Sequence, residues 1–370
     1  MRRIGPYIHQ IPAWPEFQWN QDELGMRLAS VRYHLGKVAG RMEALGFPMK
    51  KEATFQTLSL DVIKSSEIEG EVLQPDQVRS SMARHLGIKL ARMVPSEREV
   101  DGVVAMMVDA AQNYAAPLTA RRLFGWHAGL FPTGKSGGHK IVVGGWRNNP
   151  KEDPMQVVSG ALGKQRIHFE APSSDLLNKE MKTFLQWFNN KMDMDPVLKA
   201  GIAHLWFVTI HPFDDGNGRI ARAIADLQLA RADQSKERYY SMSAQIQKER
   251  KDYYRILEES QKGTLDISAW LNWFFNCLDR SLTATETTLA QVMKKARFWE
   301  TVNVTALNER QRLVVGKLLE FFEGKLTSSK WAAITKCSQD TALRDIQDLI
   351  DRGILLKDPA GGRSSNYLLK

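Results

Sequence analysis

One stretch of the 370-residue sequence joins a glycine-rich turn to the start of a helix: His211-Pro212-Phe213-Asp214-Asp215-Gly216-Asn217-Gly218-Arg219-Ile220-Ala221-Arg222. The glycines on either side of Asn217 allow the backbone to turn tightly where the helix begins. The first backbone N–H groups of a helix have no partner within it, and they lie at its positive end. The stretch therefore predicts a seat for an anion such as phosphate.

Four side chains of this stretch have the chemistry of a phosphate-transfer site. Arg219 and Arg222 are three residues apart, so they can offer two planar cations to phosphate oxygens from nearly the same face of the helix. Asp215 supplies a hard oxygen ligand for Mg²⁺, and His211 is a candidate base. Taken singly, Asp215 could be an ordinary helix cap and His211 a packing residue. Their convergence within one short segment favours the functional interpretation.

The elements around this stretch are predicted to be mainly helical. Apolar residues at three- and four-residue spacing predict helices at 196–210 and 217–232. Two β-prone pieces, at 156–158 and 166–169, predict one inserted hairpin. Further helices are predicted within 21–70, with a break at 46–48, and at 95–114 and 119–129.

The chain past Trp299 changes character. Three helices are predicted there, at 308–322, 329–335 and 338–351. Two short strands, at 354–356 and 366–369, bracket a turn at 358–362. Three helices followed by a β-hairpin are typical of a winged-helix domain.

Composition limits the class of protein. Lys and Arg number 51 against 42 Asp and Glu, and the excess is spread along the chain; it is compatible with an anionic partner such as a nucleotide. No apolar run reaches the ~18 residues of a membrane-spanning helix, and the start lacks a signal peptide. Only Cys277 and Cys337 are present, which excludes a disulfide framework or a cysteine-based zinc site. We therefore expect a soluble protein of the reducing cytoplasm, without membrane contact.

One string resembles a phosphate loop without its context. Gly129 to Ser136 matches the P-loop pattern of glycine, four residues, glycine, lysine and serine. A working P-loop follows a buried strand and precedes a helix. Here a predicted helix precedes the string and Gly137-Gly138 follows it, so we expect a surface loop.

The stretch from His211 to Arg222 resembles the active-site motif of the Fic family: histidine, proline, phenylalanine, any residue, acid, Gly-Asn-Gly-Arg, two residues and arginine. Every defined position is met. Fic proteins mostly transfer AMP from ATP to a hydroxyl group of a target protein. The resemblance implies that His211 takes the proton from a Ser, Thr or Tyr hydroxyl and that Asp215 holds Mg²⁺. The remaining motif residues would bind the phosphates of ATP: Gly216, Asn217, Gly218, Arg219 and Arg222.

Two further stretches fit this resemblance. The second strand of the predicted hairpin, Arg166-Ile167-His168-Phe169, lies where the family has its flap, which holds the target by backbone pairing. A plain surface hairpin is the alternative. Tyr253 and Tyr254, with Gln261 downstream, resemble the positions that flank adenine, although an asparagine is expected where Gln261 stands. Adjacent tyrosines on a helix are also typical of packing.

An inhibitory segment is predicted upstream. Residues at alternating three- and four-residue spacing turn from apolar to polar: Phe55, Leu58, Val62, Ser65 and Glu69. A carboxylate directed inward requires a cation. The segment from Ser65 to Gly70 resembles the Fic inhibitory motif of Ser or Thr, three residues, Glu and Gly or Asn. The resemblance implies that Glu69 pairs with Arg222 and blocks the γ-phosphate of ATP; a solvated helix end is the alternative.

The resemblance covers most of the chain. It implies a Fic helical bundle with a β-hairpin flap, organised as an N-terminal extension (1–95), a catalytic core (96–280), a linker helix (281–302) and a winged-helix-like domain (303–370). The expected function is transfer of AMP from ATP to a hydroxyl of a target protein, or of the protein itself. The same pocket could run backwards, with Glu69 orienting a water that removes AMP.

A DNA-binding regulator acting through residues 303–370 is an alternative of another class. Arg344 on the presumed recognition helix and Arg363 in the wing would contact DNA phosphates. The same helix carries four acids that oppose DNA binding: Asp340, Asp345, Asp348 and Asp351. Protein–protein contact, including a homodimer, is therefore at least an equal expectation. An inactive Fic scaffold is a third alternative, which the intact motif disfavours.

Overall fold

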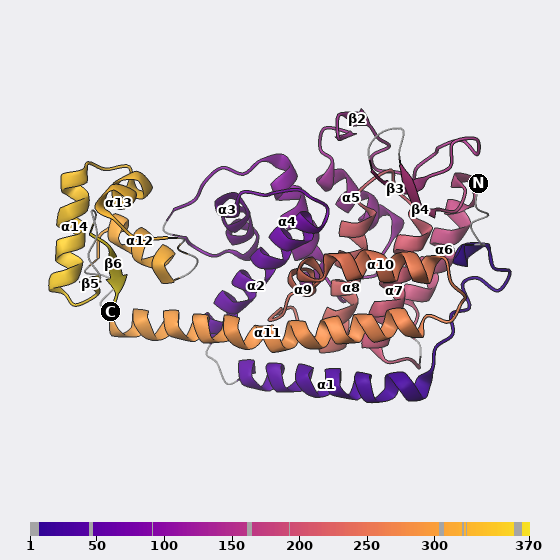
Figure 1. Cartoon of the computed structure of the whole chain (residues 1–370), viewed down its shortest axis with the longest axis horizontal. Helices are drawn as coiled ribbons and strands as arrows, with labels where there is room; N and C mark the ends of the chain where they lie inside the picture. Colours follow the sequence, from indigo (N-terminus) through magenta and orange to yellow (C-terminus); the bar gives the residue numbers. More distant parts are fainter. Residues whose placement is uncertain are drawn as a thin grey trace. The chain divides into compact units, whose positions relative to one another are not determined.

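The computed structural model describes residues 7–43, 47–90, 92–160, 165–191, 193–302, 307–319, 322, 324–358 and 365–370, with the backbone alone at 47–48, 286–297 and 300. The chain divides into two compact units (Figure 1). The first comprises Met1–Ile88 and Val94–Thr285, and the second comprises Lys89–Met93 and Glu286–Lys370. The four predicted domains are a finer division, which stays a prediction.

The first unit is built of helices. They are α1 (Gln21–Glu43), α2 (Phe47–Ile68), α3 (Pro75–Leu86), α4 (Arg98–Gln112), α5 (Ala120–Leu130), α6 (Leu177–Asn189), α7 (Pro196–Ile210), α8 (Asn217–Asp233), α9 (Met242–Lys248) and α10 (Arg250–Gln261). Two 3₁₀ turns, at Ile8–Gln10 and Ser174–Leu176, complete it. Helix α11 (Ser268–Thr301) crosses the boundary between the units. The mainly helical fold class that the sequence predicts is confirmed.

Helices α7 and α8 pack side by side at the centre of the first unit (Figure 1). Helix α7 begins at Pro196, which has no N–H to lose, and the Asp195 carboxylate accepts hydrogen bonds from the next two backbone N–H groups. Every residue of α7 from Val197 to Ile210 is buried. Because α7 is apolar on all sides, α6 and α8 cover it, while α2, α4 and α5 pack on α8.

The described strands form three antiparallel pairs. They are β1 (Lys135–Ser136) with β2 (His139–Lys140), β3 (Gln156–Ser159) with β4 (Arg166–Glu170), and β5 (Leu355–Lys357) with β6 (Tyr367–Leu369). The β3–β4 pair is the predicted hairpin, with Val157 opposite Phe169 and Ser159 opposite Arg166. Residues 161–164 of its connection lie outside the described residues.

The second unit has its own core around Trp331, which packs with Val315 and Ile346. Its helices are α12 (Glu309–Leu319), α13 (Ser328–Thr335) and α14 (Gln339–Asp351), followed by β5 and β6. These three helices and two strands match the predicted elements. The winged-helix classification stays a prediction, and Arg363 and turn residues 359–362 lie outside the described residues.

Two of the four acids on α14 are used within the second unit. Asp345, only 6% exposed, accepts hydrogen bonds from the Arg310 guanidinium at 2.7 and 3.0 Å. Asp348 pairs with Arg352 at 2.9 Å and accepts from Gln311. Asp345 and Asp348 therefore already have cationic partners within the second unit, and the effect of the four acids on DNA binding stays a prediction.

Helix α3, helix α9 and the first part of helix α11 are absent from the predicted elements. Helix α3 is mostly polar, so its apolar periodicity is short, although Pro75 at its first turn and Gly87 at its left-handed C-cap mark both ends. Helix α11 runs unbroken from Ser268, whereas the predicted linker helix begins at 281. Among the described helices, none has the length and apolar character that crossing a bilayer requires.

Candidate active site

The predicted turn connects the end of α7 to the start of α8. His211 ends α7 in the left-handed region (φ 52°), and Gly216 precedes α8 at φ 80°. A Cβ on Gly216 would lie 2.9 Å from the Phe131 ring, so both backbone conformation and space require glycine. The Asn217 side chain closes the turn, since it accepts from the Phe213 N–H at 3.0 Å and donates to the Phe213 carbonyl at 2.8 Å.

The start of α8 leaves backbone donors without partners. The first carbonyl-bound N–H of this helix is that of Ile220, which donates to Gly216 at 3.0 Å. The N–H groups of Asn217, Gly218 and Arg219 precede it, and no described residue accepts from them. Three donors at the positive end of a helix can bind an anion.

The His211 ring is arranged as a neutral base. Its Nδ1 lies 3.2 Å from the Val208 carbonyl oxygen, which can only accept, so Nδ1 carries the proton and Nε2 has a free lone pair. Burial lowers the pKa of His211 to about 4, against the opposing effect of that hydrogen bond, and the charge of Arg147 lowers it further. At neutral pH the ring can therefore accept a proton.

We predict that His211 titrates near pH 4, well below the ordinary histidine pKa of 6.5. Between these two values the unfolded chain binds the proton more readily than the folded protein, so the contribution of His211 to the free energy of unfolding falls as the pH drops through this window. The ring ¹H–¹³C NMR signals, assigned with His211→Ala, measure the pKa. Titration near 6.5 would show a solvated ring.

Arg147 holds the chain at His211, and no sequence pattern points to it. Its Nε donates to the His211 carbonyl at 2.8 Å, and its backbone N–H donates to the Pro212 carbonyl at 2.9 Å. A further guanidinium N–H donates to the Pro172 carbonyl. The residue is 2% exposed, and burial lowers the pKa of its guanidinium to about 10. Arg147 therefore positions the candidate base through its backbone.

Arg147→Met is expected to destabilise the protein by about 2–4 kcal/mol, because each buried carbonyl left without a donor costs about 1–3 kcal/mol. Urea unfolding measures the change. The matched control is Arg121→Met, since Arg121 is exposed on α5. Equal unfolding midpoints for the two variants would contradict the positioning role.

Both arginines of the turn are paired with carboxylates from the end of α2. Arg222, 2% exposed, contacts Glu69 at 2.8 Å and donates to the Ser65 hydroxyl and carbonyl, both at 2.9 Å. Arg219 contacts Glu71 at 2.6 Å. Burial raises the pKa of Glu71, although Arg219 opposes this. Sequence reasoning missed Glu71, whose only signal is its position two residues after Glu69.

The Glu69 carboxylate lies over the start of α8. A Cβ on Gly218 would collide with its Oε1. The Tyr254 hydroxyl donates to the Ile68 carbonyl at 3.2 Å and to Glu69 Oε2 at 3.4 Å. Gly70, in the left-handed region at φ 87°, separates Glu69 from Glu71. The Glu69 carboxylate therefore fills space directly beside Gly218, within the candidate anion seat.

Asp215 lies beside the turn and away from the main cavity. The Ser136 hydroxyl and the Gly216 N–H donate to its carboxylate. Ser136 belongs to the P-loop-like string, in which α5 precedes a two-residue strand, so the string lacks P-loop architecture yet contacts Asp215. The described residues contain no cluster of three metal ligands. One carboxylate beside an anion seat still fits Mg²⁺, which takes other ligands from phosphate and water.

A cavity of about 720 Å³ lies between the hairpin, α10 and the turn. Predicted site residues that line it are Glu69, Arg166, His168, Phe169, His211, Gly218, Tyr253, Tyr254 and Gln261. Those that do not line it are Ser65, Gly70, Ile167, Asp215, Gly216, Asn217, Arg219 and Arg222. Side chains of both arginines are buried behind Glu69 and Glu71, so a phosphate must displace carboxylates to reach them.

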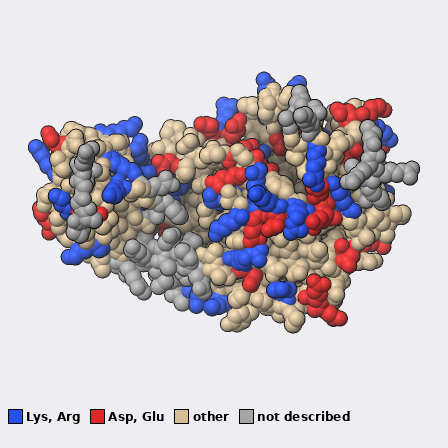
Figure 2. Space-filling view, viewed as in Figure 1, with Lys and Arg blue, Asp and Glu red and all other residues tan. Residues whose placement is uncertain are grey.

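The hairpin is tied to α10 by Glu258. Its carboxylate accepts from Arg166 at 2.8 Å, from His168 Nδ1 at 2.6 Å and from Lys262 at 2.6 Å. Burial would raise the pKa of Glu258, but these hydrogen bonds lower it to about 2. Figure 2 shows acidic and basic side chains interspersed over α10. The side chains of β4 are thus already engaged, whereas its backbone edge away from β3 pairs with no described strand.

The residues of the adenine side have internal partners. The Tyr253 hydroxyl lies 2.9 Å from His204 Nε2, and its side chain is buried. Gln261 donates to the Thr209 hydroxyl at 3.3 Å. Both residues form cavity wall and core at once, so the packing and ligand-binding interpretations are compatible.

The fold and the site define a helical protein in which unpartnered backbone N–H groups, a neutral histidine and two carboxylate–arginine pairs meet at one turn. Residues 117–229 match the Fic/DOC family, and the chain therefore contains a Fic domain. Residues 7–88 match a domain of unknown function, DUF4172.

Relatives share this domain. The chain is 25% identical over 238 residues to a protein adenylyltransferase Fic of Drosophila mojavensis, covering 63% of this chain and 41% of the relative. It is 32% identical over 115 residues to the Nematostella vectensis protein of the same name, covering 30% and 25%. The chain thus spans less than half the length of either relative. The crystal structure of a Fic family protein from Desulfovibrio desulfuricans shares the fold, with a TM-score of 0.51, 19% identity and coverage of 93% and 96%.

Proposed function

We propose that this protein transfers AMP from ATP to a Ser, Thr or Tyr hydroxyl of a target protein, or of itself. One observation carries the proposal: a neutral His211, with Nε2 unprotonated, lines the same cavity as Gly218, which is the middle one of the three residues whose N–H groups are unpartnered at the start of α8. Relatives named protein adenylyltransferase contain the same domain. Residues 96–280 would form the catalytic core, followed by the linker helix.

His211 acts as general base in this mechanism. Its Nε2 accepts the hydroxyl proton as the oxygen attacks the α-phosphorus of ATP; a new P–O bond forms, the bond to the bridging oxygen breaks, and pyrophosphate leaves. The N–H groups of Asn217, Gly218 and Arg219 stabilise charge on the phosphate oxygens. Asp215 would hold Mg²⁺, which supplies positive charge to the phosphates when bound.

The remaining predicted residues would bind the two substrates, ATP and the target protein. Arg219 and Arg222 would hold the outer phosphates once released from their carboxylates. The cavity walls at Tyr253, Tyr254 and Gln261 would flank adenine. The free edge of β4, from Arg166 to Phe169, would pair with the backbone of the target.

Autoinhibition is part of the proposal. Glu69 holds Arg222 and lies over Gly218, so bound ATP and this carboxylate exclude each other. Ser65 fixes the other side of the Arg222 guanidinium, and Gly70 allows the chain to turn after Glu69. Because Glu69 also lines the cavity of His211, it could instead orient a water for removal of AMP, which is the second candidate reaction.

The position of the label in ATP tests the proposal. A protein extract incubated with the Glu69→Gly variant and ATP is expected to gain label from the α-phosphate and none from the γ-phosphate. Label from the γ-phosphate alone would show a kinase, and AMP released from pre-labelled protein would show the reverse reaction.

Glu71→Gln is expected to raise the rate of AMP transfer by about 2–5-fold, since Glu71 is half-exposed and such ion pairs are worth about 1 kcal/mol or less. The control is Glu97→Gln, because Glu97 is an exposed acid that contacts neither arginine. Initial rates measure both. An unchanged rate for Glu71→Gln would indicate that Glu69 alone inhibits AMP transfer.

Partners beyond the target protein stay predictions. Arg344 and the other residues of the second unit would contact DNA or protein, and Asp345 and Asp348, already paired, would not repel DNA strongly. Retention of the full chain on duplex DNA at low salt tests whether the second unit binds DNA. The homodimer is tested by light scattering.

A further inference from the structure

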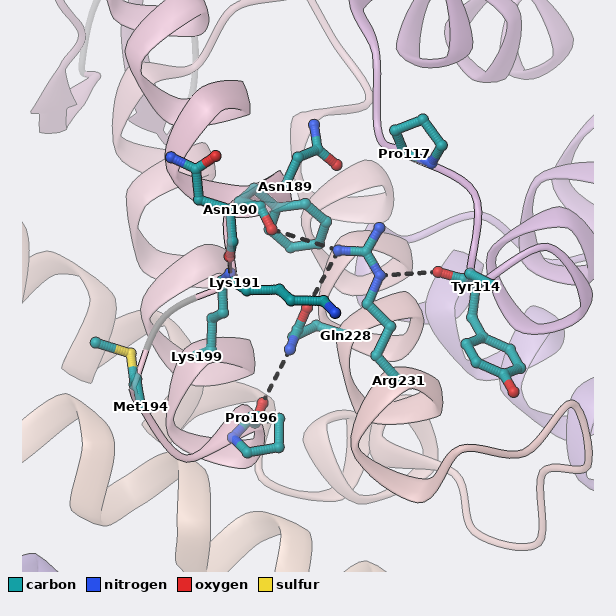
Figure 3. A pocket seen from close by; sticks show the side chains of 12 residues that line it. Tyr114, Pro117, Asn189, Asn190, Lys191, Met194, Pro196, Lys199, Gln228 and Arg231 are labelled. Atoms are coloured by element: carbon teal, nitrogen blue, oxygen red, sulfur yellow. Dashed lines mark hydrogen bonds between the residues drawn. The ribbon is translucent and has the colours of Figure 1, made fainter.

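A second cavity, of about 580 Å³, lies between the start of α7 and the end of α8 (Figure 3). The candidate active site lies at the other ends of these two helices. Pro196 and Lys199 reach it from the start of α7, and Gln228 and Arg231 from the end of α8. The end of α6 and the connection between α4 and α5 complete its wall. None of the mechanism proposed above uses these residues.

Three cations line this cavity, and none of its lining residues is acidic: Lys191, Lys199 and Arg231. Lys199 is only 7% exposed, and burial together with the charge of Arg231 lowers the pKa of its ammonium to about 8. Burial also lowers the pKa of Arg231 to about 10. Placing a half-buried arginine beside a buried lysine without a carboxylate costs free energy, which a bound anion would offset.

Lys199 is buried and Arg231 is half-buried, and protein groups hold both cations in place. Arg231 donates to three backbone carbonyls, those of Tyr114 at 2.8 Å, Ala116 at 3.0 Å and Phe188 at 3.3 Å. Lys199 donates to the Asn190 carbonyl at 2.8 Å, and its ammonium lies 5.2 Å from the centre of the Trp187 ring and 5.9 Å from that of Phe188. No oxygen or nitrogen of a described residue accepts from its two other N–H groups. The backbone carbonyls at the end of α6 offset part of the positive charge of Lys199 and Arg231. They cannot neutralise it, because a carbonyl oxygen carries only a partial negative charge.

Lys191 can complete the site from outside. Figure 3 shows its side chain extending toward Gln228 and Arg231, and no described residue pairs with it. It is exposed, so it can move as a ligand enters. The cavity thus combines the buried Lys199, the half-buried Arg231, the exposed Lys191 and the amide of Gln228.

We propose that this cavity binds a small phosphomonoester. The dianionic phosphate group would lie among Lys199, Arg231 and Lys191. Its double negative charge balances two or three cations better than the single charge of a carboxylate ligand would. Phe188, Pro117 and Met194 give the organic part an apolar wall. The inference is independent of AMP transfer, because it rests on a separate cavity.

Calorimetric titration of the full-length protein with phenyl phosphate tests the proposal. Binding is expected for the unaltered protein, at least about tenfold weaker binding for Lys199→Met, and about 3–10-fold weaker binding for Lys191→Gln, whose exposed position leaves folding intact. Arg222→Ala is the matched control for binding at the active site, and its affinity should be unchanged.

Several results would overturn the proposal. They are absence of binding at millimolar phenyl phosphate, equal affinity in both lysine variants, or loss of binding in Arg222→Ala. Citrate binding with the same lysine dependence, without phenyl phosphate binding, would reject the phosphomonoester class. If Lys199 only caps α6, Lys199→Met lowers the melting temperature, while Lys191→Gln binds phenyl phosphate as tightly as the unaltered protein does. That result would also reject the proposal.

Discussion

Glu69→Gly is expected to raise the initial rate of AMP transfer by about 10²–10³-fold, because releasing a buried charge pair is worth about 3–5 kcal/mol and this pair is partly exposed on the Glu69 side. The change frees the Arg222 guanidinium and clears the space over Gly218. Incorporation of α-labelled ATP into protein measures the rate.

A neighbouring carboxylate provides the matched control for this release. Glu67 lies in the last turn of α2, two residues before Glu69, but it pairs with Lys64 at 2.7 Å and contacts neither Arg219 nor Arg222. Glu67→Gly should therefore leave the rate of AMP transfer within about twofold of that of the unaltered protein. Surface substitutions of this kind change the free energy of unfolding by only about 0.5 kcal/mol. Equal rates of AMP transfer for the unaltered protein and Glu69→Gly would refute inhibition by Glu69.

His211→Ala, introduced into the Glu69→Gly variant, is expected to lower the rate of AMP transfer by about 10²–10⁴-fold, the usual contribution of a general base. ATP affinity should change little, because the N–H groups at the start of α8 and the two arginines remain. Single-turnover labelling measures the chemical step, and calorimetry measures ATP binding.

The two measurements separate a base from a binding residue. A lost rate with retained ATP affinity assigns His211 to proton transfer. A lost affinity would instead assign it to nucleotide binding, and a full rate in the double variant would remove it from the mechanism. The control is His85→Ala, because His85 is exposed at the end of α3.

Local patterns account for what the sequence predicts well. Helices α7 and α8, the turn between them and the β3–β4 hairpin follow from apolar periodicity, β-propensity and glycine placement, which act over a few residues. The ion pair between Glu69 and Arg222 was implied by family resemblance, and the structure contains it at 2.8 Å. Its inhibitory role is the proposed part.

Long-range pairing accounts for what the sequence does not reveal. Arg147 meets His211 across 64 positions, and Glu71 meets Arg219 across 148. Neither contact leaves a periodic signal, because tertiary packing alone brings these segments together. The same holds for Lys199 and Arg231, whose helices α7 and α8 read only as core helices in the sequence.

A crystal structure of Glu69→Gly with ATP and Mg²⁺ tests the central claim most directly. The account predicts the triphosphate on the N–H groups of Asn217, Gly218 and Arg219, with the Arg222 guanidinium turned to a terminal phosphate and His211 Nε2 facing the α-phosphorus. A triphosphate bound elsewhere, or a His211 ring turned away from the nucleotide, would contradict it.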